Sequence, residues 1–133
     1  MAPKIERLDH LVLTVRDLAA SRDFYTRVLG MEERTGPGPT ALHFGDSKIH
    51  LHQAGKEFEP KSAHPTPGSG DLCFTTPSPI DTVLAALSEA GVEIIEGPVR
   101  RVGARATLLS VYFRDPDGNL IEVSNELQTP SRA

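Results

Sequence analysis

The feature of this 133-residue sequence that most constrains its fold is a repeat of one structural unit. Each half begins with a strand-like run, continues into a helix-like segment and reaches a glycine. The two glycines are 91 − 30 = 61 residues apart, and His10 and Asp71, on the two opening runs, are also 71 − 10 = 61 residues apart. Copies of one supersecondary unit normally combine through their sheets. The sequence therefore predicts a single domain, residues 1–133, made of two similar modules.

The first module, at about residues 6–54, shows the order βαβββ. Residues 8–15 (LDHLVLTV) are rich in aliphatic side chains and predict a strand. Asp17 offers an N-cap to a helix over residues 18–29, which Gly30 ends. Three short strands are then expected between turn-forming residues, at 31–35, 41–44 and 48–53.

The second module, at about residues 70–126, repeats this order after a Gly- and Pro-rich linker at 55–69. Ser78 is expected to cap its helix, with Pro79 at the first helical position and Gly91 after the end. The predicted fold class is α+β, with two βαβββ modules forming an open, mainly antiparallel barrel-like cavity. The expected strands are 71–76, 92–95, 108–114 and 119–125, with 100–106 as a loop.

Composition narrows the classes of protein to which this chain can belong. The net charge is 14 − 18 = −4, which does not suit a domain that neutralises many phosphates, so no nucleic acid partner is expected. The longest apolar runs are far shorter than a membrane span. The single cysteine forms no intrachain disulfide, and the first residues (MAPKIERLDH) lack the apolar core of a secretory signal. We therefore expect a cytoplasmic protein without a membrane partner.

Alternation along the strands separates an apolar face from a polar one. Leu11, Leu13 and Val15 share a face opposite His10, and the other opening and closing strands follow the same pattern. The helices are expected to cover the apolar faces, which leaves the polar faces toward the cavity. The polar residues placed there are His10, His50, His52, Asp71 and Glu122.

Imidazoles and carboxylates that converge in a partly enclosed cavity are costly to desolvate unless they are paired or bind a cation. Their joint occurrence at repeat-related positions favours a divalent metal site. The alternative is that each of them is a solvent-wetted polar residue on an open sheet face.

Three segments carry a resemblance to a known family: LDHLVLTVRDLAASRDFYTRVLGME at the start, DLCFTT at the opening of the second half, and VYFRDPDGNLIEVSN at the end. Together they resemble the vicinal oxygen chelate superfamily, which includes glyoxalase I, fosfomycin resistance transferases, bleomycin resistance proteins and extradiol dioxygenases. The segment ALHFGDSKIHLHQAGKEFEP is most similar to glyoxalase-domain-containing proteins. The resemblance implies two βαβββ modules around one divalent metal ion.

The resemblance also implies a ligand set for that ion. His10 matches the first-strand ligand and Glu122 the last-strand ligand, while Asp71 stands where the family usually has a second-module histidine. His50 stands where glyoxalase I has an optional glutamate, and His52, with the same alternation, is the alternative. The implied ligands are thus His10, His50, Asp71 and Glu122 for Zn, Ni, Mn or Fe, and Glu122 is the one remaining candidate for a catalytic base.

Three functions remain open at this point. The first is a metal-dependent glyoxalase-like enzyme of lyase or isomerase type, acting on a small oxygen-rich substrate such as a thiol adduct. The second is an extradiol-type iron dioxygenase, and the third is a non-catalytic ligand-binding protein of the bleomycin-resistance type. Because a domain of this size gains stability by covering its sheet edges, we expect a homodimer, with the modules paired within one chain or exchanged between subunits.

A few further residues have two interpretations each. Tyr112 and Arg114 share one face of a strand, where Arg114 either faces the cavity or stabilises the following turn. Cys73 shares the polar alternation but is expected to be a small buried apolar residue. A group of arginines either holds an anionic substrate or lies on a solvated loop: Arg100, Arg101 and Arg105.

Overall fold

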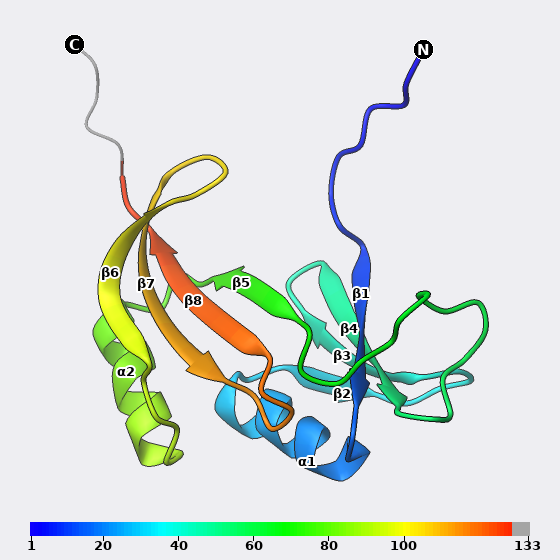
Figure 1. Ribbon diagram of the computed structural model, residues 1–133. Coiled ribbons are helices and arrows are strands. Elements are labelled where there is room, and N and C mark those ends of the chain that lie inside the picture. Colours follow the sequence, from blue (N-terminus) through cyan, green and yellow to red (C-terminus); the bar gives the residue numbers. More distant parts are fainter. Residues whose placement is uncertain (129–133) are drawn as a thin grey trace. The chain divides into compact units, whose positions relative to one another are not determined.

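The computed structural model describes residues 1–128, and the chain divides into two compact units, one of residues 1–67 and one that begins at Gly68. Each unit holds one four-stranded mixed sheet (Figure 1). The strand orders are β1-β4-β3-β2 and β5-β8-β7-β6, so each opening strand lies at an edge beside the last strand of its module. These equivalent orders confirm the predicted α+β fold with two similar modules.

The first module forms its sheet from one parallel and two antiparallel pairs. β1 runs parallel to β4, whereas β3 pairs antiparallel with both β4 and β2. Its elements are β1 (His10–Val15), α1 (Leu18–Asp23), the π-helical turn η1 (Phe24–Val28), β2 (Glu32–Arg34), β3 (Thr40–Phe44) and β4 (Ser47–Gln53).

The first helix begins where the sequence predicts but changes its winding. The Asp17 carboxylate accepts hydrogen bonds from the Ala19 and Ala20 N–H groups at 3.0 and 3.3 Å, which confirms the N-cap. The helical segment predicted over 18–29 is present from Leu18 to Val28, and from Phe24 onward its winding is π-helical. In this π-helical turn Phe24 and Tyr25 are both buried, and their rings meet edge to face with centroids 5.3 Å apart.

The second module repeats this arrangement. β5 runs parallel to β8, and β7 pairs antiparallel with both β8 and β6. Helix α2 packs against β7 and β8 on one face of this sheet (Figure 1). The elements are β5 (Asp71–Thr75), α2 (Ile80–Glu89), β6 (Glu96–Val102), β7 (Thr107–Arg114) and β8 (Leu120–Glu126).

Strand β6 lies later in the chain than the sequence predicts. Residues 92–95 form no strand, and the first three residues of the expected loop at 100–106 belong instead to β6, which runs to Val102. The register shifts between Glu96 and Val99, around a glycine with φ +112° and a proline that has no N–H to donate. Because β6 is an edge strand, it tolerates this irregularity and resumes its pairing beyond it.

The start of α2 also differs from the expectation. Pro79 occupies the N-cap position, and no side chain caps the helix. The Ser78 N–H instead donates to the Thr76 hydroxyl at 3.1 Å, so Ser78 belongs to the preceding turn. The helix still ends before Gly91, whose φ of +73° breaks the helical conformation as predicted.

The cores confirm the alternation of apolar and polar faces. In the first module, Leu13 and Val15 of β1 are buried together with Ile49 and Leu51 of β4. In the second module, apolar side chains of one face of β7 and β8 are buried, among them Val111, Phe113, Ile121 and Val123. Within residues 1–128, no helix is long and apolar enough to cross a membrane.

Candidate metal centre

The polar face of the first sheet brings two predicted ligands together. The register pairs Val12 with His50 and His10 with Lys48, so His10 and His50 lie on the same face of neighbouring strands. Their rings stack with centroids 4.7 Å apart and planes 21° apart. His10 is exposed and His50 is half-buried, so this pair of imidazoles stays open to a ligand.

The structure also distinguishes His50 from His52. Burial, together with the positive charge of Lys48, lowers the pKa of His50, which favours the neutral form that binds metals. His52 is only 6% exposed, and its ring lies 5.3 Å from that of Phe58 in the segment after β4. The more accessible ring beside His10 is therefore that of His50.

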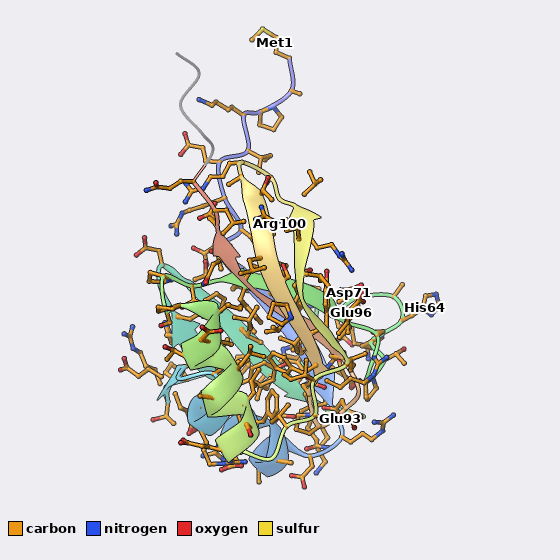
Figure 2. The ribbon with its side chains drawn as sticks, turned by 90° about the vertical axis from the view of Figure 1, so that its left-hand side faces the viewer. Met1, His64, Asp71, Glu93, Glu96 and Arg100 are labelled. Atoms are coloured by element: carbon orange, nitrogen blue, oxygen red, sulfur yellow. The ribbon has the colours of Figure 1, made fainter. Side chains whose placement is uncertain are left out.

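The second sheet carries the two acidic candidates on its polar face. Asp71 is exposed at the start of β5 (Figure 2), and Glu122 on β8 pairs in register with Cys73 on β5. The Ser124 hydroxyl donates to Glu122 Oε2 at 3.3 Å and lies 2.6 Å from the fully buried Ser110 hydroxyl. These two serines anchor the Glu122 carboxylate to the sheet.

The two pairs of candidates occupy equivalent places in their modules. His10 and Asp71 are the first residues of the opening strands. His50 and Glu122 lie on the last strands, opposite the third residue of the opening strand in both sheets. Among residues 1–128, no three His, Cys, Asp or Glu side chains form a metal-binding group. The four-ligand site therefore stays a prediction.

Comparison with known proteins identifies the family. The model of the Glyoxalase/Bleomycin resistance protein/Dioxygenase superfamily matches residues 7–123. The chain belongs to this superfamily. It is 54% identical over 121 residues to the virulence protein STM3117 of Salmonella typhimurium, covering 90% of this chain and 84% of that protein.

Two further comparisons agree with this membership. The glyoxalase domain-containing protein RDO1 of Mycosarcoma maydis is 52% identical over 122 residues, which cover 91% of this chain and 69% of RDO1. The crystal structure of STM3117 superposes with a TM-score of 0.92, at 52% identity, over 94% of this chain and all of that one. The glyoxalase-superfamily fold inferred from the sequence motifs is thereby confirmed.

One polar contact, between Arg101 and Tyr112, was not expected from the sequence. Arg101 lies on β6, where its Nε donates to the Tyr112 hydroxyl at 3.1 Å and its Nη2 to Glu96 Oε1 at 3.1 Å. Tyr112 pairs in register with Glu122, and burial, together with that carboxylate, raises the pKa of its hydroxyl. Proline is tolerated at a bulge in an edge strand. An edge strand with a bulge at Pro98 would therefore have predicted that Arg101 lies on a strand beside Tyr112 rather than in a loop.

Arg114 stabilises the turn between β7 and β8. Its Nη1 donates to the Gly118 carbonyl at 3.1 Å. Asp115 Oδ1 accepts the N–H groups of Asp117 and Asn119, both at 2.9 Å. Of the two interpretations of Arg114, the geometry thus supports the structural one.

Cys73 is not the buried apolar residue that the sequence suggested. The residue is exposed on the edge strand β5, and its Sγ lies 3.5 Å from the Ser124 hydroxyl. Partial burial of the thiol raises its pKa, and the nearby Glu122 and Asp71 carboxylates act in the same direction. The thiol is therefore kept protonated rather than activated as a nucleophile.

Proposed function

We propose that this chain is a divalent-metal-dependent glyoxalase-like enzyme of lyase or isomerase type. Its substrate is a small oxygen-rich molecule, such as the adduct of a thiol with a carbonyl compound. The observation that carries the proposal is the stacked pair of His10 and His50, together with Asp71 and Glu122 at the equivalent register positions of the second sheet. The glyoxalase names of the family and of RDO1 support the same reaction class.

The chemistry of the donors fits a divalent ion. Two imidazole nitrogens and two carboxylate oxygens suit Zn, Ni, Mn or Fe rather than an ion that prefers thiolates. The neutral form of His50, which burial favours, has a free lone pair for such an ion. When bound, the ion supplies Lewis-acid polarisation of the substrate oxygens.

Glu122 is the residue that we assign to proton transfer. The hydroxyl of Ser124 donates to its Oε2 and so fixes the orientation of the carboxylate on the polar face. Glu122 accepts a proton from the carbon next to the substrate carbonyl and returns it to the neighbouring carbon, which isomerises the adduct without net loss of atoms. Tyr112, on the adjacent strand, places its hydroxyl beside this carboxylate.

We also propose that the protein is a homodimer. Several large apolar side chains are exposed, among them Ile5 at 81% and Val102 at 97%. The edge strands of both sheets leave backbone groups unpaired, which a second copy would cover. A dimeric mass by light scattering at micromolar concentration is the expected result, and a monomer would refute it.

Metal binding by the purified protein tests the function directly. We expect one stoichiometric divalent ion by elemental analysis. His10→Ala and Glu122→Ala should each weaken binding by more than the roughly 10–100-fold that the loss of an outer-shell partner costs. His64→Ala is the matched control, because His64 lies exposed in the loop between the modules (Figure 2) and should leave metal content unchanged.

The second-module ligand needs its own variants. Asp71→Ala should weaken metal binding, whereas Asp71→His should largely retain it, because imidazole is an equally suitable donor. If Asp71→Ala leaves metal content unchanged and His52→Ala abolishes it, the ligand assignment at both positions is wrong.

Activity assays separate the proposed reaction from the other functions of the superfamily. The metal-loaded protein should consume the hemithioacetal of methylglyoxal and glutathione, or a related adduct, and Glu122→Gln should abolish turnover. Oxygen uptake with catechol by the iron-loaded protein would instead indicate a ring-cleaving dioxygenase. A protein that binds no metal ion would be a ligand-binding protein, and the proposal would fail.

A further inference from the structure

The segment before β1 is fixed to the rest of the first module although its side chains are exposed. It precedes His10 directly and runs beside the turn between β3 and β4. Three hydrogen bonds join them: Arg7 Nη1 donates to the Asp46 carbonyl at 2.9 Å, Ser47 Oγ donates to the Leu8 carbonyl at 3.2 Å, and the Lys48 N–H donates to the Asp9 carbonyl at 3.3 Å. The backbone that carries the Asp9 side chain is therefore held in place.

The Asp9 carboxylate lies between two basic groups. Its Oδ1 is 3.0 Å from His10 Nδ1, and its Oδ2 is 3.8 Å from Arg7 Nη2. An aspartate carboxylate is ionised near neutral pH, so in this contact it can only accept a hydrogen bond. In this contact His10 Nδ1 must carry the hydrogen, and the lone pair of the neutral ring is then on Nε2.

We propose that Asp9, steadied by Arg7, is a positioning residue for His10. It holds the imidazole in the Nδ1–H tautomer and presents Nε2 as the nitrogen that binds the metal ion. The stack against His50 fixes the same ring from its face, so two contacts define its orientation. A carboxylate on the second nitrogen also makes a histidine a more basic ligand. The inference rests on the proposed metal-dependent function, in which His10 is a ligand.

The tautomer of His10 tests the geometry without any metal ion. In chelator-treated protein at about pH 8, well above the reference histidine pKa of about 6.5, long-range ¹H–¹⁵N NMR should show His10 as the Nδ1–H tautomer. In Asp9→Ala the Nε2–H form, which free imidazole side chains prefer in water, should become the major one. Asp46→Ala is the matched control, since Asp46 contributes its backbone carbonyl and not its side chain to the contact with Arg7.

The affinity for Zn²⁺, measured by competition with a chromophoric chelator, tests whether this positioning of His10 strengthens metal binding. Asp9→Ala should weaken binding by about 10–100-fold. Asp9→Asn should recover part of this loss, because an amide oxygen still accepts the Nδ1–H, and the urea midpoint of the metal-free variants should not change by a comparable amount. If Asp9 had only a structural role, Asp9→Ala would lower the urea midpoint of the metal-free protein, and Asp9→Asn would not recover affinity for Zn²⁺.

Two outcomes separate this inference from the proposed function. If the wild-type protein binds Zn²⁺ and Asp9→Ala changes neither the tautomer nor the affinity, the positioning role is refuted while the metal site stands. If His10 is the Nδ1–H tautomer but the wild-type protein binds no divalent ion, the role of Asp9 in fixing the ring is supported and the metal-dependent function is refuted.

Discussion

Asn119, directly before β8, links Gly70 to Asp115 through its side chain. The loss of stability on its replacement by alanine can be worked out from these two contacts. The side chain is 1% exposed. Its Oδ1 accepts the Gly70 N–H at 2.7 Å, and its Nδ2 donates to Asp115 Oδ2, also at 2.7 Å. Asn119→Ala removes one hydrogen bond to a backbone amide and one to a buried carboxylate, worth about 1 and about 2 kcal/mol. We expect the free energy of unfolding to fall by about 3 kcal/mol.

Urea denaturation measures this loss. With an m-value of about 2 kcal/mol/M, the midpoint should fall by about 1.5 M at unchanged m. Asn125→Ala is the matched control: its Nδ2 donates to the Thr76 and Ser78 carbonyls at 3.0 and 2.7 Å, but the residue is half-buried and water replaces it there. That variant should lose about 1 kcal/mol, or about 0.5 M. Equal midpoints for Asn119→Ala and Asn125→Ala would refute the reasoning.

Three further predictions concern a close approach, a cap and an ion pair. Gly97→Ala should lower the thermal midpoint strongly, because φ is +112° and a Cβ would collide with a β7 carbonyl, whereas Gly36→Ala, with open space around it, should not. Asp17→Ala should cost about 1 kcal/mol in urea denaturation, and Asp17→Asn much less, since an amide oxygen still caps the helix. The hydrogen bond from Arg105 lowers the pKa of the Glu126 carboxyl in the folded protein. This pair therefore stabilises the fold fully above the ordinary glutamate pKa, and the stabilisation is lost as pH falls through the lowered pKa of Glu126. NMR titration should show the pKa of Glu126 rising toward its ordinary value in Arg105→Gln, and an unchanged value would contradict the assignment of its cause.

Much of the fold could be predicted because the signals are local. Alternation placed Leu13 and Val15 in the core and His10 on the opposite face, since side chains of a strand must alternate whatever the strand pairs with. Gly30 and Gly91 marked the helix ends, and both adopt positive φ, which other residues reach only with strain. The equivalent positions of the two pairs of candidate ligands follow from the same repeat.

Other features were decided by contacts between segments distant in the sequence. The stack of His10 on His50 depends on the parallel register of β1 and β4, which neither strand specifies alone. The position of β6 depends on its antiparallel partner β7, because an edge strand forms only where a neighbour offers backbone groups in register. The β-branched run at residues 92–95 has the higher strand propensity. Pairing nevertheless selected the arginine-containing segment Glu96–Val102, since hydrogen bonds to β7 outweigh local propensity and bring Arg101 to Tyr112.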